Sequence, residues 1–374
     1  MYYPQKLMEE YQKMAPGEAR LSGIRQAIQE ADLEKDYGYM MFFRYEYACA
    51  CDNNYLLYLY VIFPEILDLF EAHPEIEMPP DCYITAEEAV KDVFTWVIDC
   101  ADFFYQISVS DMEKYLAKYK SFCQKYGYSL CMYHMAAARL YRAAGKKEKA
   151  MQSLHEFRLF NRSHHIRNAD TIAFEGEMAC WYGDLEHLLK AGKLLETKYY
   201  DEYTLIFQYG RLLYHYAVRL HDVKQAEPYY KKMEHLRQKQ QMHSCYFADT
   251  IVYLTLTNLQ AAWSFFKEEA PYQALTYTPL DKMEFCTGAE IMMRALMKQG
   301  KKNVRLKLPS KLPYHQPDGC YRIETLAEYY GKEARDISKK FDIRNGNDNS
   351  MKEYHLFLDA VKHCIALPTG SGKA

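Results

Sequence analysis

The sequence predicts an all-α fold, a right-handed α-solenoid of antiparallel helix pairs with irregular helices capping both ends. Three observations favour it. Apolar residues recur at helical spacing along most of the chain. One helix-turn-helix pattern recurs at a fixed step. The 374 residues include only 13 prolines and 16 glycines, so long helices are seldom interrupted.

The N-terminal part is expected to be a helical capping region over residues 1–84. Its three helices are predicted at the ranges 19–34, 37–50 and 54–72. The proline-rich stretch HPEIEMPPDCYI at 73–84 then breaks the helical pattern.

The next two helices have recognisable start signals. Thr85 is expected to cap a helix, with Glu88 three residues later in the arrangement of a capping box. Asp111 is expected to cap the following helix, which runs to about Lys125. These helices open a repeat region that we predict over residues 85–300.

The stretch ARLYRAAGKKEKAMQSLHEF at 138–157 encodes a helix, a tight turn and the start of a second helix. Gly145 ends the first helix. A step of 38 residues leads from Gly145 to Gly183, and the same step leads on to His221. Four apolar columns keep this step: Leu140, Met178 and Tyr216; Ala144, Tyr182 and Leu220; Ala150, Leu188 and Ala226; Phe157, Leu195 and Met233.

This pattern resembles the tetratricopeptide repeat, a helix-turn-helix unit of about 34 residues. Ala138, Tyr141 and Ala150 occupy the small, aromatic and small positions of that family in the first copy. Gly176 takes the first small position in the second copy, whereas Tyr214 departs from the pattern in the third. The resemblance covers residues 131–240 and implies that the first helix of each pair lines a concave surface.

The resemblance also implies which residues face that surface, at the second, fifth, ninth and twelfth positions of units starting at 131, 169 and 207. Their mixture of charges suits an extended peptide, whose carboxylates arginines bind through forked hydrogen bonds. The carboxylate-clamp subclass of the family has lysine and asparagine where this chain has Met135 and Arg139, so its ligand is not carried over. The expected peptide-binding residues are Arg139, Arg142, Asp170, Glu177, Gln208, Arg211 and His215.

Two more helices at 246–268 and 279–299 are expected to complete the repeat region, with Gly300 ending the second. The remaining residues, 301–374, are predicted to form a crossing segment, capping helices and a flexible tail. The crossing segment NVRLKLPSKLPYHQPDG at 303–319 is expected to be non-helical, with a short strand at 304–308.

The last two helices are predicted at 321–341 and 350–365, around the loop RNGNDNS. Gly346 is expected to end the first helix, and Ser350 or Asn349 to cap the second. The loop is a second candidate binding surface, because Arg344 and the asparagines offer hydrogen bonds to a partner.

No catalytic, cofactor or metal site is expected. The sequence contains no GxSxG, HExxH or glycine-rich turn after a strand. Its histidines and cysteines, His164 and His165 included, lack the converging spacing that zinc needs. The tail LPTGSGKA has Leu367 where a P-loop needs glycine, and Ala374 follows its lysine.

Composition excludes several classes of partner. The formal net charge of -3 gives no basic excess for nucleic-acid binding. The densest apolar stretch, at 55–70, contains Pro64, Glu65 and Asp68, so we expect no membrane span. The 11 cysteines are scattered without a CxxC pair, and the N-terminus does not resemble a signal peptide. We therefore expect a reduced, soluble, cytoplasmic protein.

These features predict a non-catalytic scaffold that binds a protein or peptide segment on the concave face. Two alternatives stay open. One is a peptide-sensing regulator without a DNA-binding domain, since residues 1–84 show no basic recognition helix. The other is an enzyme whose catalytic residues assemble only in three dimensions.

Overall fold

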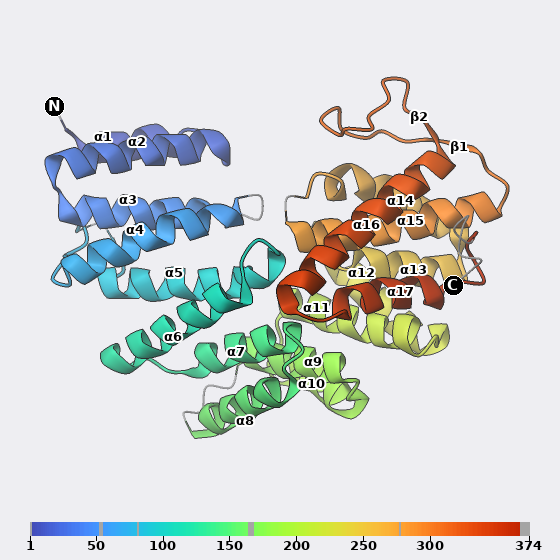
Figure 1. The fold of residues 1–374 in the computed structure, drawn as a ribbon, viewed down its shortest axis with the longest axis horizontal. Helices are drawn as coiled ribbons and strands as arrows, with labels where there is room; N and C mark the ends of the chain where they lie inside the picture. Colours follow the sequence, from blue (N-terminus) through green and yellow to red (C-terminus); the bar gives the residue numbers. More distant parts are fainter. Residues whose placement is uncertain (1, 52–54, 81, 164–167, 277, 367–374) are drawn as a thin grey trace. The chain divides into compact units, whose positions relative to one another are not determined.

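The computed structural model is almost entirely helical (Figure 1). It describes residues 2–51, 55–80, 82–163, 168–276 and 278–366. Over these ranges the chain forms α-helices α1 to α17 and one two-stranded sheet, which confirms the predicted all-α class. His164, His165 and the tail 367–374 lie outside the described residues. Two compact units are present, Met1–Phe157 (unit 1) and Arg158–Ala374 (unit 2).

Unit 1 is a series of helices in which each packs against the next from α1 to α7. Arg44 ties three of them together: it donates two hydrogen bonds to Asp32, at 2.8 and 2.9 Å, and one to Glu65 at 3.2 Å. The helices are α1 (Pro4–Gln12), α2 (Glu18–Glu34), α3 (Tyr37–Ala50), α4 (Leu59–Ala72), α5 (Ala86–Cys100), α6 (Val109–Tyr126), α7 (Cys131–Ala143) and the first part of α8 (Lys147–Ser163).

Unit 2 continues with helix pairs and ends with a hairpin and two further helices. The elements are α9 (Ala169–Tyr182), α10 (Leu185–Thr197), α11 (Glu202–Leu213), a π-helical turn (Tyr214–Arg219), α12 (Val223–Lys239), α13 (Phe247–Thr257), α14 (Leu259–Gln273), α15 (Pro279–Lys298), β1 (Asn303–Arg305), β2 (Cys320–Arg322), α16 (Ile323–Asn345) and α17 (Asn349–Ala360). β1 and β2 pair antiparallel.

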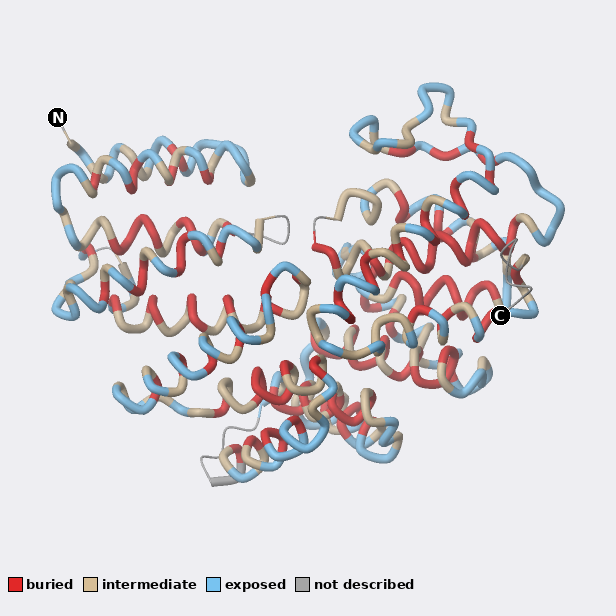
Figure 2. The backbone as a smooth tube through the Cα atoms, in the orientation of Figure 1, coloured by how far each residue is buried: buried red, intermediate tan, exposed pale blue. Residues whose placement is uncertain are grey.

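The first helices of consecutive pairs in unit 2, α9, α11, α13 and α15, also pack against one another. This arrangement is that of a helical repeat, in which each element contacts its neighbours in sequence order. Figure 2 shows buried residues recurring along the helices. Residues 285–296 of α15 and 247–255 of α13 are buried without interruption, so these two helices form the centre of the unit.

The two units differ from the three predicted regions 1–84, 85–300 and 301–374. Helix α5 packs on α3 and α4 across residue 84. Helix α15 packs along α16 across residue 300.

The turns of the repeated pattern have one backbone geometry. Gly145, Gly183 and His221 all adopt left-handed conformations, with φ of 69°, 73° and 55°. This is the conformation that ends a helix and starts a tight turn. The local pattern thus identified three equivalent turns, one of them without glycine.

Three of the four apolar columns are buried in every copy. The exception is the column that ends at Leu220, which is 52% exposed. The third pair begins at Glu202, earlier than the predicted 207, and contains the π-helical turn Tyr214–Arg219. A π turn holds more residues than an α turn and rotates the side chains that follow. Tyr141, at the aromatic position of the first copy, is partly exposed, with the Lys149 ammonium 5.1 Å from its ring centroid.

The capping predictions are confirmed in part. Thr85 and Glu88 form both hydrogen bonds of the capping box. Asp111 does not cap α6: Ser108 does, by accepting a hydrogen bond from the Asp111 N–H at 3.1 Å. Asp111 lies in the first turn instead, where its negative charge interacts favourably with the positive end of the helix dipole.

Two corrections concern the C-terminal helices. The predicted helix 246–268 is divided at Asn258, which leaves helical geometry and caps α14 through the Ala261 N–H. Gly346 ends α16 as predicted, with φ of 67°. Neither Ser350 nor Asn349 caps α17 with its side chain, because the Asp342 carboxylate of α16 accepts the N–H groups of Ser350 and Met351 at 2.8 and 3.0 Å.

Glycines on the first helices permit close contact between neighbouring elements. At Gly176 a Cβ atom would lie 2.5 Å from Gln208 Oε1, so a side chain at this predicted small position would require the Gln208 amide to shift. At Gly210 on α11 a Cβ atom would lie 2.2 Å from the Tyr246 ring, which precedes α13. The contact of α11 with α13 therefore depends on a missing side chain.

We predict that Gly210→Ala destabilises the chain by about 1–3 kcal/mol, because the added methyl group overpacks against an aromatic ring. Gly192→Ala is the matched control. Its Cβ would have its nearest neighbours at 3.6 Å, an ordinary contact distance, so better helix propensity should stabilise it by about 0.5–1 kcal/mol. Urea denaturation measures both. A gain in stability for both variants would contradict the close contact at Gly210.

Candidate functional site

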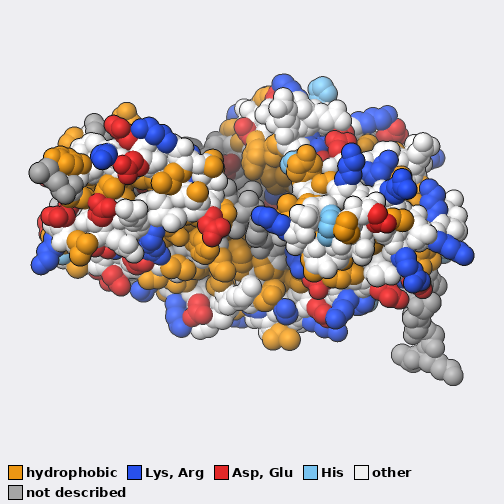
Figure 3. Space-filling view, turned by 90° about the horizontal axis from the view of Figure 1, so that it is seen from above, with side chains coloured by type: hydrophobic (Ala, Val, Ile, Leu, Met, Phe, Trp, Pro, Cys, Tyr) orange, Lys and Arg blue, Asp and Glu red, His pale blue; other side chains and the backbone are white. Residues whose placement is uncertain are grey.

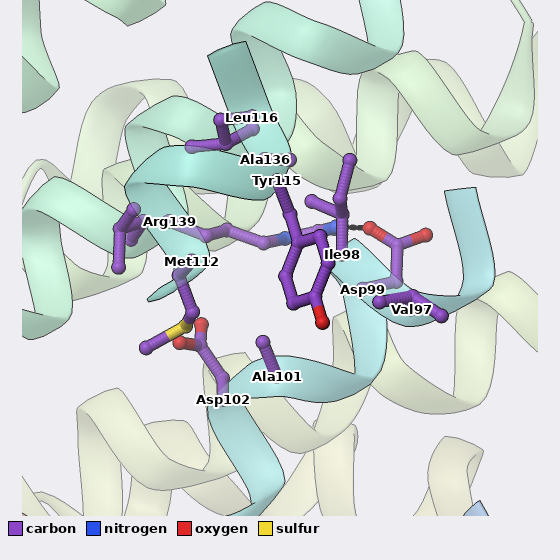
Figure 4. Close-up of a pocket in the computed structure, with 11 residues that line it drawn as sticks. Val97, Ile98, Asp99, Ala101, Asp102, Met112, Tyr115, Leu116, Ala136 and Arg139 are labelled. Atoms are coloured by element: carbon purple, nitrogen blue, oxygen red, sulfur yellow. Dashed lines mark hydrogen bonds and ion pairs between the residues drawn. The ribbon is translucent and has the colours of Figure 1, made fainter. Parts of the chain in front are cut away.

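Two of the predicted binding residues, Arg139 and Arg142, lie on α7 in unit 1. The Arg139 guanidinium forms an ion pair with Asp99 of α5 at 3.3 Å. Figure 4 shows this pair at a small cavity that also involves Tyr115 of α6. The cavity holds about 10 Å³, room for about one water molecule. Arg139 therefore connects α7 to α5, and both predicted arginines are only partly exposed.

The other five predicted residues lie in unit 2, and three of them reach solvent. Asp170 is exposed in the first turn of α9. Glu177 of α9 and Arg211 of α11 are partly exposed, with an Nη2 to Oε2 distance of 3.7 Å. Arg211 also donates a hydrogen bond to the Ala173 carbonyl at 3.3 Å. The structure thus brings Glu177 and Arg211 together across α9 and α11, the first helices of two consecutive pairs.

Gln208 and His215 do not reach solvent. Gln208 is 0% exposed and donates a hydrogen bond to the Leu188 carbonyl at 2.9 Å. His215 is 4% exposed, and burial lowers the pKa of its imidazole, which favours the neutral form. Because the third pair begins at Glu202 and not at 207, the count from 207 places Gln208 and His215 at buried positions, whereas Arg211 stays partly exposed.

Sequence reasoning missed a larger group of polar side chains around Glu177 and Arg211, which we call the polar band. Its members interact electrostatically or through hydrogen bonds and come from helices that pack against one another. They are Glu177 and Cys180 of α9, Arg211 of α11, Tyr214 and Arg219 of the π turn, Tyr246 and Asp249 at the start of α13, Asp281 and Glu284 of α15, and Glu353 of α17.

Arg219 joins the band to the end of α9. It donates hydrogen bonds to the carbonyls of Cys180 and Trp181 at 3.0 and 3.2 Å. These carbonyls carry the partial negative charge of the helix C-terminus, which a cation stabilises. The same guanidinium donates to the Tyr214 hydroxyl at 3.0 Å, and Tyr214 also forms a hydrogen bond with Glu353.

The carboxylates of the band have unusual protonation. Asp249 is 6% exposed, and burial, with a contribution from the charge of Glu353, raises its pKa to about 8. Burial also raises the pKa of Glu284 well above its ordinary value, and the charges of Asp281, Asp249 and Glu353 raise it further. At neutral pH Asp249 therefore holds a proton, because burial disfavours its charged form and the negative charge of Glu353 adds to that effect.

The band therefore favours cations that approach it. A positively charged group would stabilise the ionised carboxylates and displace their protons. No metal site is evident, since no group of three or more potential ligands converges within the described ranges. The sequence did carry a signal: Asp249 is the only charged residue of the apolar helix FADTIVYLTLT. A lone carboxylate in such a helix indicates a buried polar site.

Comparisons with known proteins identify no relative. No protein-family model matches the chain, and no curated protein or solved structure is significantly similar to it. In the part of the chain that the structure describes, no helix combines the length and apolar character needed to cross a bilayer. On the face shown in Figure 3, basic and acidic side chains are interspersed. Function is therefore inferred from the chain's own geometry.

We predict that Asp249→Asn reduces the pH dependence of stability between pH 5 and pH 8.5. Folded Asp249 keeps its proton up to about pH 8, whereas in the unfolded chain the carboxyl has lost it above about pH 4. Folding thus binds a proton in this window, and the free energy of unfolding falls as pH rises. Urea denaturation of both proteins at pH 5, 7 and 8.5 measures the slope. An unchanged slope would show that Asp249 titrates normally.

Proposed function

We propose that the chain is a non-catalytic protein- or peptide-binding scaffold, and that the polar band binds an extended segment carrying a basic residue. The observation that carries this proposal is the row of first helices α9, α11, α13 and α15. Each helix packs against the next, and each contributes polar side chains to the same band. A row of this kind offers successive contacts to a chain lying across it.

The chemistry of the band supports a basic ligand. The negative charges of Asp281, Asp249 and Glu353 raise the pKa of Glu284 beyond the effect of burial. The charge of Glu353 does the same for Asp249. A lysine or arginine side chain would offset this repulsion and gain charge-assisted hydrogen bonds. Tyr246 is partly exposed beside the acids, and its ring adds an apolar surface to a polar site.

The likeness to tetratricopeptide repeats is a further part of the proposal. The three left-handed turns at Gly145, Gly183 and His221 and the small residue Gly176 agree with that pattern. Arrays of this family present their first helices to peptide ligands. Of the predicted binding residues we retain Asp170, Glu177 and Arg211, which reach solvent in unit 2, and add the carboxylates of the band.

We predict that random peptides displayed on phage and selected against the full chain will be enriched in lysine or arginine. Glu284→Gln should weaken binding of a selected peptide at least about tenfold, as expected when a charge-assisted contact is lost. Binding should also tighten from pH 6 to pH 8.5, because the band must release protons to accept a cation. Calorimetric titration at both pH values measures these effects.

Glu186→Gln is the matched control. Glu186 is exposed on α10, a second helix of a pair, so this variant should bind like the wild type. The proposal fails if selection yields no peptides, if the peptides lack basic residues, or if both variants bind equally well.

A further inference from the structure

Unit 1 contains a groove that the proposed function does not use. It lies between α4 and α6, with α5 contributing Phe94. Its volume is about 450 Å³. Sites for small organic ligands typically span about 300–1,000 Å³, so the groove has the size of a ligand site rather than a packing defect.

Aromatic rings form one wall of the groove. The ring centroid of Phe122 of α6 lies 6.2 Å from that of Phe70, 5.7 Å from that of Phe94 and 4.7 Å from that of Tyr126. Phe70 and Phe94 are 5% and 2% exposed, whereas Phe122 and Tyr126 are partly exposed. These rings form a continuous surface suited to an acyl chain or an aromatic ring.

Small side chains keep the groove open. Ala117 and Ser121 of α6 line it, are exposed and lie one helical turn apart. Larger residues at these two positions would fill the space above the aromatic rings. The depth of the groove therefore depends on specific small residues of α6.

The charges along the groove are unequal. Lys118 and Lys125 are exposed on α6, two helical turns or about 10 Å apart. Neither forms an ion pair in the described ranges, and the Lys125 ammonium lies 4.8 Å from the Tyr126 ring centroid. Glu71 on the opposite side, from α4, is the one carboxylate among the lining residues. The negative charge of a ligand is thus favoured on the α6 side of the groove and disfavoured on the α4 side.

We infer that this groove binds a small amphipathic anion, an acyl or aryl carboxylate. Its apolar part lies on Phe70, Phe94 and Phe122, and its carboxylate lies between Lys118 and Lys125. Burial of the apolar part supplies most of the affinity. The two ammonium groups select an anion over a neutral or cationic molecule of the same length.

Three probes with the same ten-carbon chain test the inference on the full chain by isothermal titration calorimetry: decanoate, decanol and decyltrimethylammonium. Decanoate should bind with one-to-one saturation and at least about tenfold more tightly than the other two. The three probes have similar alkyl chains and differ mainly in the charge of the head group. The inference is overturned if decanoate does not saturate, or if the three probes bind equally.

Amino-acid substitutions test whether decanoate binds in this groove. Ser121→Trp should abolish decanoate binding by filling the groove, and the double charge reversal Lys118→Glu with Lys125→Glu should weaken it at least about tenfold. Lys120→Glu is the control, because the Lys120 ammonium lies 5.3 Å from the Tyr133 ring centroid, outside the groove. All changes are tested for folding by circular dichroism. If Ser121→Trp does not fold, the double charge reversal is the deciding test. The inference is overturned if that variant binds decanoate as tightly as the wild type does.

Discussion

The close packing of first helices in unit 2 is the constraint on which the rest of that unit depends. Gly176 and Gly210 lack side chains where the next element approaches. With any larger residue at Gly210, the Tyr246 ring and the start of α13 would have to move away from α11. Interiors packed to the density of organic crystals do not absorb such a change without strain. Two glycines thus set the spacing of α9, α11 and α13.

This spacing creates the electrostatics of the polar band. Glu177, Asp249 and Glu284 are distant in sequence but come from first helices that lie in one row. Burial disfavours the charged forms of Asp249 and Glu284, and neighbouring carboxylates add repulsion, so the pKa of both groups is raised. A cationic ligand would stabilise the charged forms of these buried carboxylates, which links the packing of the helices to the proposed binding of a basic segment.

Local signals were readable from the sequence, whereas long-range ones were not. The turns at Gly183 and His221 and the capping box at Thr85 depend on nearby residues, and all were predicted. The start of the third pair depends on tertiary packing, so counting from 207 placed Gln208 at an exposed position that the structure shows to be buried. The cap of α17 comes from Asp342 in another helix, which no local pattern indicates.

The most direct measurement for this account is infrared spectroscopy of the protonated carboxyl groups at pH 7. If α9, α11, α13 and α15 bring the acids together, wild-type protein should show the carbonyl band of a protonated carboxylic acid, and Asp249→Asn should lose part of it. Absence of that band at pH 7, or an identical band in the variant, would contradict the burial of Asp249 among other carboxylates and with it the polar band.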